Sequence, residues 1–210
     1  MKIWDIENNF YYKSDKSRIN KVVSQFEIFK KSIKIKGAIV ECGVFKGASL
    51  IRFLTFRDLL KKSKKKTIGF DPFGRFPKQK FIDDVKFAHA HDKSSGFGIS
   101  HKKLRNILKK KKFSNFNLVK GNIFTSLPAF LKKSKKFKIS FLHLDMDVYA
   151  PTKFALETLF DKVSKNGLVL IDDYNQVKGA TKATNEFIKK RNLKISTLEF
   201  DKRLNFIIKK

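Results

Sequence analysis

The stretch GAIVECGVFKGAS, residues 37–49, joins a short apolar run to a glycine-rich segment and the start of a helical pattern. Residues 38–42 are apolar except for Glu41, which is typical of a strand buried on both faces. Gly43 and Gly47 follow with the spacing E-x-G-x-x-x-G. Small residues let a ligand approach the backbone, and the next helix offers free N–H groups. The stretch therefore predicts a strand, a ligand-binding turn and a helix.

Apolar runs and helical patterns alternate along the rest of the chain. Apolar residues recur at three- and four-residue spacing over 17–34, and Pro151 and Gly167 bracket a predicted helix at 151–164. KISTLEF and LNFIIKK flank the turn DKR and predict a hairpin that makes the last strand antiparallel. The pattern favours an α/β fold with helices on both faces of a mostly parallel sheet of seven strands. The other predicted strands are 38–42, 67–71, 116–120, 139–145 and 168–172.

Length and composition favour one domain over residues 1–210, because 41% of the residues are hydrophobic, enough for a single core. Within it we expect an N-terminal helical cap at 1–36 and one long irregular connection at 74–103 that acts as a lid. The beginning of the chain lacks an apolar signal-type core, and no apolar run approaches the roughly 18 residues of a membrane span. These features predict a cytoplasmic protein without a membrane partner. The single cysteine, Cys42, excludes an internal disulfide and is expected in the core.

The net charge of +29 raises the alternative of a nucleic-acid-binding or RNA-methylating protein. Only seven of the 48 basic residues are arginine, whereas bidentate phosphate contacts and base contacts favour arginine. The lysine runs at 61–66, 109–112 and 132–136 fall where helices are expected to end, and no aromatic residues are interleaved with them. The pattern favours solvated lysine faces over a nucleic-acid partner.

Carboxylates stand at the ends of the predicted strands 139–145 and 168–172, as Asp145 and Asp147 in LHLDMDVY and as an acidic pair in LVLIDDYN. Ligands of open parallel sheets bind beyond the carboxyl ends of the strands. A D-x-D loop also occurs in haloacid-dehalogenase-type Mg²⁺-dependent phosphatases, a second alternative, but there it follows the first core strand. Here about 140 residues precede it, which disfavours the phosphatase interpretation.

Two acidic residues near the first strands indicate a cofactor. Glu41 stands in place of the first glycine of a dinucleotide-binding turn, where it would repel a pyrophosphate but suits an ammonium group. Asp71 ends the second predicted strand, where an acidic side chain can accept the hydroxyls of a ribose. Together with the glycines, these residues indicate S-adenosylmethionine.

Four segments, in order and spacing, resemble the TylF-type macrocin O-methyltransferase family: GAIVECGVFKGAS, GFDPFGRFP, VKGNIFTSLP and LHLDMDVYAPTKFALETLFDKVSKNGLVLIDDYN. The resemblance covers roughly residues 18–190. It implies a Rossmann-like class I methyltransferase fold, S-adenosylmethionine, Mg²⁺, and methylation of a sugar hydroxyl. The small-molecule acceptor would be a nucleotide-activated deoxysugar or a glycoside, and a homo-oligomer is compatible with this assignment.

The resemblance also assigns site residues. The metal ligands it implies are Asp145, Asp172 and Asp173, with Asp145 accepting the hydroxyl proton, and oxygen ligands of this kind suit Mg²⁺. Because alternate strand residues point to opposite faces, the strand must turn at the acidic pair, while Asp147 and Tyr149 are expected to brace the loop. The cofactor residues it implies are Glu41, Gly43, Gly47, Ser49, Asp71, Phe73 and Asn122.

The sequence departs from the family pattern at two places. Asn122 stands where related enzymes often have aspartate near the adenine, and FDPFGRFP replaces the usual FDSFEGLP, so that Arg75 occupies an acidic position. Arg75, Lys78 and Lys80 are candidates to hold the diphosphate of a sugar nucleotide.

The histidines divide by position. His143 lies inside a predicted strand and is expected to be a hydrogen-bonded core residue. His89, His91 and His101 lie in the predicted lid, where a role in substrate binding or as a base is open.

Overall fold

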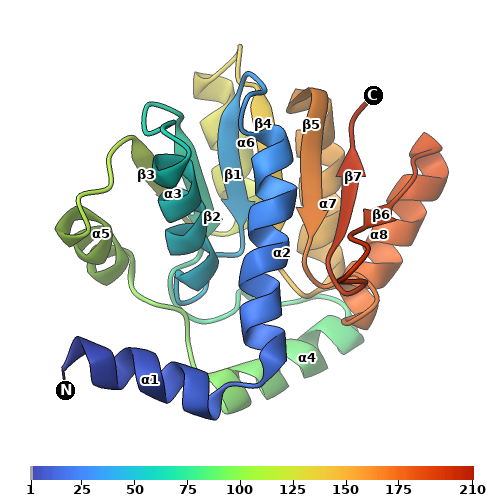
Figure 1. The fold of residues 1–210 in the computed structure, drawn as a ribbon. Coiled ribbons are helices and arrows are strands. Elements are labelled where there is room, and N and C mark those ends of the chain that lie inside the picture. Colours follow the sequence, from blue (N-terminus) through green and yellow to red (C-terminus); the bar gives the residue numbers. More distant parts are fainter. Residues whose placement is uncertain (1) are drawn as a thin grey trace.

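The computed structural model describes residues 2–210 and contains a seven-stranded sheet with the strand order β3-β2-β1-β4-β5-β7-β6 (Figure 1). The strands are β1 (Ala38–Cys42), β2 (Thr67–Asp71), β3 (Phe116–Lys120), β4 (Ile139–Leu144), β5 (Val163–Ile171), β6 (Ser196–Thr197) and β7 (Asn205–Ile208). β1 to β5 pair in parallel, and β7 runs antiparallel to both β5 and β6. The predicted α/β fold, including the terminal hairpin, is confirmed.

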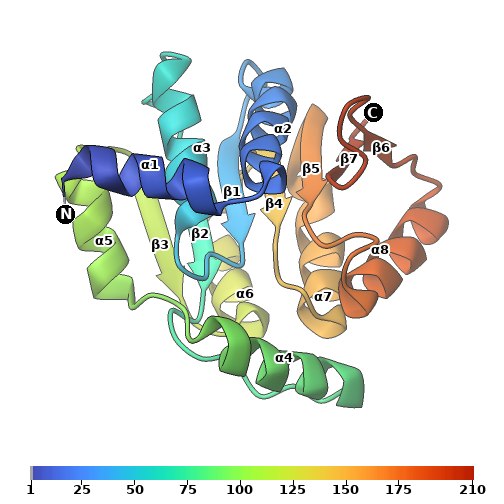
Figure 2. The ribbon, with the colours of Figure 1, turned by 60° about the horizontal axis from the view of Figure 1, so that its bottom comes forward.

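Helices cover both faces of the sheet (Figures 1 and 2). The helices are α1 (Ile3–Lys13), α2 (Lys16–Ser32), α3 (Ala48–Leu59), α4 (Ile82–Ser95), α5 (His101–Lys110), α6 (Ile123–Lys133), α7 (Tyr149–Leu159) and α8 (Lys178–Arg191). Apolar residues of α2 and α3 pack on one face of the sheet, and those of α6, α7 and α8 pack on the other. A third cluster joins α3 to α5. Burial of β1, β2 and β4 on both faces explains why their sequences are continuous apolar runs.

The strand order reverses at β1, which lies between β2 and β4. In such sheets the chain leaves neighbouring strands toward opposite faces, which opens a crevice beyond their carboxyl ends. The turns after β1, β2, β4 and β5 meet at this edge, and α4 lies across it in both ribbon views. The topology therefore places the predicted glycine turn and the predicted acidic residues at one edge.

Two local predictions were wrong in detail. The segment 74–103 was expected to be irregular, but it contains α4 and the start of α5. The prediction missed α4 because the polar residues of this segment leave only a weak apolar pattern. The helix predicted at 151–164 ends at Leu159 and is followed by a 3₁₀ turn, so that β5 already begins at Val163. Gly167 therefore lies in an irregular part of β5 rather than beyond a helix, and the β4–β5 register shifts there.

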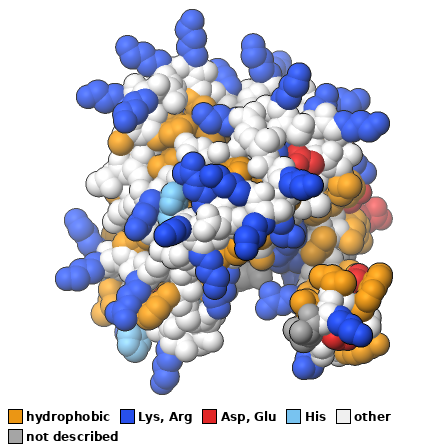
Figure 3. Space-filling model, turned by 90° about the vertical axis from the view of Figure 1, so that its left-hand side faces the viewer, with side chains coloured by type: hydrophobic (Ala, Val, Ile, Leu, Met, Phe, Trp, Pro, Cys, Tyr) orange, Lys and Arg blue, Asp and Glu red, His pale blue; other side chains and the backbone are white. Residues whose placement is uncertain are grey.

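Lysine and arginine side chains are spread over the whole of the face shown in Figure 3, with hydrophobic and uncharged surface between them. This distribution agrees with solvated lysine faces. Across residues 2–210, every helix is too short or too polar to cross a lipid bilayer.

Candidate active site

The turn after β1 approaches the turn after β4 so closely that it requires glycine. Gly43 has a φ of +89°, and a Cβ atom on it would lie 1.7 Å from the backbone oxygen of Asp145. The Asp145 N–H also donates to the Cys42 carbonyl at 2.9 Å. Gly47, with a φ of +86°, precedes the first residue of α3. The two predicted glycines thus shape the turn, and Gly43 joins it to the acidic residue predicted to be catalytic.

Asp71, at the end of β2, holds the same turn. Its Oδ2 accepts the backbone N–H groups of Val44 and Phe45 at 2.8 and 3.0 Å, and its Oδ1 accepts that of Phe73. Burial raises the pKa of Asp71, while these three hydrogen bonds oppose the rise. A carboxylate offers about four acceptor positions, so the three bonds leave room for one more partner such as a ribose hydroxyl.

Glu41 is fully buried beside β4. Its Oε1 accepts a hydrogen bond from Nδ1 of His143 at 2.9 Å, whereas Oε2 has no hydrogen-bond partner within residues 2–210. A buried carboxylate oxygen without a partner is costly. Oε2 therefore needs a hydrogen-bond donor, and the ammonium group of the ligand expected from the sequence would be one.

His143 connects Glu41 to the acidic residues after β5. Its Nε2 lies 3.4 Å from Oδ1 of Asp172, and Oδ2 of Asp172 pairs with Lys21 of α2. Burial opposes a charge on His143, but hydrogen bonds to Asp172 and Glu41 raise its pKa to about 10. The prediction of a hydrogen-bonded core histidine is confirmed. The sequence reasoning missed that it links two sets of site residues, although Glu41 and His143 are register partners of β1 and β4.

Asp145 belongs to two groups of side chains that could hold a metal ion. In the first, its ligand atom lies within 4.8 Å of those of His143 and Asp172, and in the second within 4.8 Å of those of Asp147 and Asp173. The structure thus places both Asp172 and Asp173 beside Asp145, as predicted, but in separate groups. Asp147, expected only to brace the loop, joins the second group, and its N–H also donates to Asp173 at 3.0 Å.

The pKa values of the acidic residues are shifted in different directions. Burial and the charge of Asp172 raise the pKa of Asp145 to about 8. Burial, with the charges of Asp145 and Asp147, raises the pKa of Asp173 well above its usual range. Burial would also raise the pKa of Asp172, but His143 and Lys21 outweigh it and lower this pKa. Crowded carboxylates with raised pKa values fit a hard divalent cation, which takes oxygen ligands and relieves their repulsion.

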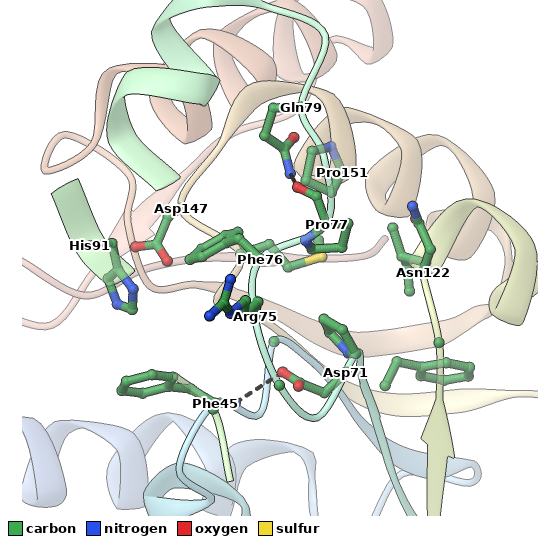
Figure 4. Close-up of a pocket in the computed structure, with 18 of the residues that line it drawn as sticks. Phe45, Asp71, Arg75, Phe76, Pro77, Gln79, His91, Asn122, Asp147 and Pro151 are labelled. Carbon is green, nitrogen blue, oxygen red and sulfur yellow. Dashed lines mark hydrogen bonds between the residues drawn. The ribbon is translucent and has the colours of Figure 1, made fainter. Parts of the chain in front are cut away.

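The four aspartates Asp145, Asp147, Asp172 and Asp173 form the acidic cluster. A cavity of about 190 Å³ lies between the glycine turn, this cluster and α4 (Figure 4). Four predicted site residues line it: Gly43, Asp71, Asn122 and Asp145. Asn122 also caps α6, since its side chain accepts the N–H of Phe124 at 3.2 Å. The other predicted residues lie outside the lining: Glu41, Gly47, Ser49, Phe73, Asp172 and Asp173.

Phe73 is a packing residue at the edge of the site. It is buried and packs edge-on against His101 at a centroid distance of 5.2 Å. The His101 ring in turn lies 3.1 Å from the Leu118 carbonyl, so this histidine has a structural contact. Of the three histidines in the predicted lid, His91 lines the cavity and His89 is exposed.

The fold and this site together define a Rossmann-like class I methyltransferase architecture. Residues 14–208 match the family described as Macrocin-O-methyltransferase (TylF). The chain therefore belongs to the TylF macrocin-O-methyltransferase family, a family of methyltransferase enzymes, as its four motifs predicted.

Similar proteins agree with this membership. The chain is 24% identical over 175 residues to demethyldecarbamoylnovobiocin O-methyltransferase of Streptomyces niveus. The aligned region covers 80% of this chain and 64% of that relative. The chain thus spans somewhat less than two thirds of the length of this curated relative.

Two solved structures show the same fold. CalS11, a calicheamicin methyltransferase, has a TM-score of 0.81 at 19% identity over 99% of this chain and 86% of its own. An apo structure of CalS11, described as a TDP-rhamnose 3'-O-methyltransferase in calicheamicin biosynthesis, has a TM-score of 0.75 with the same identity and coverage.

Proposed function

We propose that this protein is an S-adenosylmethionine-dependent O-methyltransferase that acts on a sugar hydroxyl and uses Mg²⁺. Family membership supports methyl transfer. The observation that carries the assignment of the site is the contact between Gly43 and Asp145, which joins the glycine turn to a cluster of carboxylates at one cavity. A cofactor held at the turn would have its reacting end beside the acidic residues.

The cofactor would be held by the β1 and β2 side of the cavity. Gly43 lines the cavity two residues beyond Glu41, whose unpaired carboxylate oxygen suits the ammonium group of S-adenosylmethionine. Asp71 has one acceptor position left for the ribose. Asn122 can accept from or donate to the adenine edge.

The predicted ligands Asp145, Asp172 and Asp173 would hold the metal ion, with Asp145 acting either beside Asp172 or beside Asp173 and Asp147. When bound, the ion would make an acceptor hydroxyl easier to deprotonate. Asp145 lines the cavity and would accept the hydroxyl proton. Bound S-adenosylmethionine would supply the methyl group for an acceptor oxygen and would be released as S-adenosylhomocysteine. The residues around the cavity would hold the acceptor hydroxyl against the cofactor while Asp145 accepts its proton.

We favour a nucleotide-linked deoxysugar as the acceptor. Arg75 and Lys78 line the cavity, and the guanidinium of Arg75 is held over the ring of Phe97 at 4.4 Å. Two cations at a cavity wall suit a diphosphate. Lys80, the third candidate, lies outside the lining. CalS11, with the same fold, is described as acting on TDP-rhamnose. A cytoplasmic location and a homo-oligomeric state remain predictions.

Calorimetry tests the cofactor assignment. S-adenosylmethionine and S-adenosylhomocysteine should bind wild type, and Glu41→Ala and Asp71→Ala should weaken binding by about tenfold or more, because each removes a charged hydrogen-bond partner. Glu157→Ala, which removes an exposed carboxylate, serves as the control and should leave affinity unchanged. Binding of NAD without S-adenosylmethionine would contradict the assignment.

A methyl-transfer assay with a panel of acceptors tests the substrate class. Wild type should methylate TDP-rhamnose or a related nucleotide sugar and leave structured RNA unmethylated. Methylation of RNA alone would contradict the sugar assignment and support the nucleic-acid alternative.

A further inference from the structure

Helix α4 is attached firmly to the acidic side of the cavity. Asp84, in its first turn, is 2% exposed and accepts the backbone N–H groups of Tyr149 and Ala150 at 2.9 and 3.2 Å. These N–H groups belong to the first turn of α7, which begins two residues after Asp147. A carboxylate at a helix N-terminus is well placed to stabilise it. The segment predicted to be a lid is therefore held beside the acidic residues.

α4 presents one imidazole to the cavity. The His91 ring packs edge-on against Phe45 and Phe76 at centroid distances of 5.0 and 5.2 Å, and stacks against Phe87 at 6.0 Å. In Figure 4, His91 and the carboxyl group of Asp147 face each other at the same end of the cavity. Three aromatic rings thus pack around this imidazole at the cavity wall.

The His91 side chain has an unused hydrogen-bonding atom. Its Nδ1 is buried and finds no hydrogen-bond partner in the part of the chain that the structure describes. A buried polar atom of this kind is unfavourable unless a partner is supplied. The ring lines the cavity, so a turn of the side chain would bring Nδ1 to the cavity surface, where a bound molecule can supply that partner.

We propose that His91 is an acceptor-positioning residue, whose Nδ1 forms a hydrogen bond with a hydroxyl of the sugar other than the one that is methylated. The inference rests on the proposed function. The partner is assigned to the acceptor rather than to the cofactor because His91 and Asp147 share one end of the cavity, whereas Asp71 and Asn122 line another part of it (Figure 4). The rings of Phe45 and Phe76 provide apolar surface for the face of a deoxysugar.

The test measures steady-state kinetics with TDP-rhamnose as acceptor, together with the affinity for S-adenosylhomocysteine. His91→Phe keeps the aromatic packing and removes the hydrogen bond, so the KM for TDP-rhamnose should rise about tenfold, with little change in kcat or in cofactor affinity. His91→Asn keeps a hydrogen-bonding group near Nδ1 and should recover part of the loss. His89→Phe changes an exposed histidine of the same helix and should behave as wild type.

Three other results would contradict either the role of His91 or the proposed function. An unchanged KM in His91→Phe, with wild type active, would contradict the role of His91 while leaving the proposed function intact. Loss of S-adenosylhomocysteine affinity would place His91 in the cofactor site instead. If wild type neither binds nor methylates TDP-rhamnose, the nucleotide-sugar function is wrong and the role of His91 is wrong with it.

Discussion

The two sides of the cavity are built differently. On the β1 and β2 side, the hydrogen bonds of Asp71 to backbone N–H groups hold the glycine turn in place within the chain itself. On the β4 and β5 side, Asp145 is surrounded by other carboxylates, and burial raises the pKa values of Asp145, Asp147 and Asp173.

The comparison shows which side needs a bound group. The glycine turn itself is stabilised by contacts that already exist, and on its side only the Oε2 of Glu41, unpaired within residues 2–210, calls for a bound group. The acidic side gathers like charges that repel one another, and a cation would stabilise it. Substitutions on the β1 and β2 side should therefore lower stability and cofactor affinity, whereas substitutions on the β4 and β5 side should lower the rate of catalysis.

The largest effect is expected from Asp145→Asn. This change would remove a proposed metal-ligand oxygen and the proposed acceptor of the hydroxyl proton, so kcat should fall by about 10²–10⁴-fold. S-adenosylhomocysteine affinity should change little, because the proposed cofactor contacts lie on the other side. Asp147→Asn is the matched control in the same loop and should lose less activity. Equal rates for Asp145→Asn and wild type in a methyl-transfer assay would remove the catalytic role of the acidic side.

Removal of divalent cations tests the same side without a mutation. EDTA should reduce turnover by at least about 10²-fold, since the proposed Mg²⁺ would no longer activate the acceptor hydroxyl. Calorimetry in EDTA should still detect S-adenosylhomocysteine, and added Mg²⁺ should restore turnover. Full activity in chelator would show that the carboxylates are structural.

Gly43→Ala should act on the other side. A Cβ atom there clashes with the Asp145 backbone, and the residue must also adopt a positive φ. Overpacking costs about 1–3 kcal/mol and the left-handed conformation about 1–2 kcal/mol. The thermal midpoint and the S-adenosylhomocysteine affinity should therefore both fall. Gly74→Ala is the control for the thermal midpoint, because its Cβ would meet no atom within 4 Å. A stable Gly43→Ala protein would mean that the two turns can separate at low cost.

The smallest effect is expected away from both sides, at Asp201. Burial would raise the pKa of Asp201, but hydrogen bonds from Ser24 and Arg203 lower it. Because its pKa is lower in the folded state than in the unfolded state, Asp201 stabilises the fold at pH values above its unfolded-state pKa. This stabilisation is lost as the pH falls through the folded-state pKa. Asp201→Asn should thus be less stable than wild type at neutral pH by about 1 kcal/mol. In denaturant titrations, that difference should shrink below about pH 4. A difference independent of pH would assign the effect to packing.

The fold was largely predictable because its signals are local. β1, β2 and β3 have the bounds expected from their apolar runs, and the terminal hairpin forms as predicted. α4 was missed because its contact with the rest of the molecule depends on single residues such as Asp84 rather than on a broad apolar face.

The site was predictable in composition but less so in arrangement. The acidic residues meet as their positions after β4 and β5 indicated, and Asp147 joins them because the turn after β4 places it beside Asp173. Glu41 lies behind the cavity surface rather than in its lining, which a sequence cannot show because depth depends on the surrounding packing.

By itself the sequence determined the strands, the glycine turn and the acidic residues at the strand ends, because apolar periodicity and turn chemistry act over a few neighbouring residues. Only the tertiary structure decided that Glu41 and His143, 102 positions apart, share a hydrogen bond, and that His91 rather than His89 enters the cavity. The physical reason is that these contacts depend on strand order, register and the docking of α4, which bring together residues that no local pattern connects.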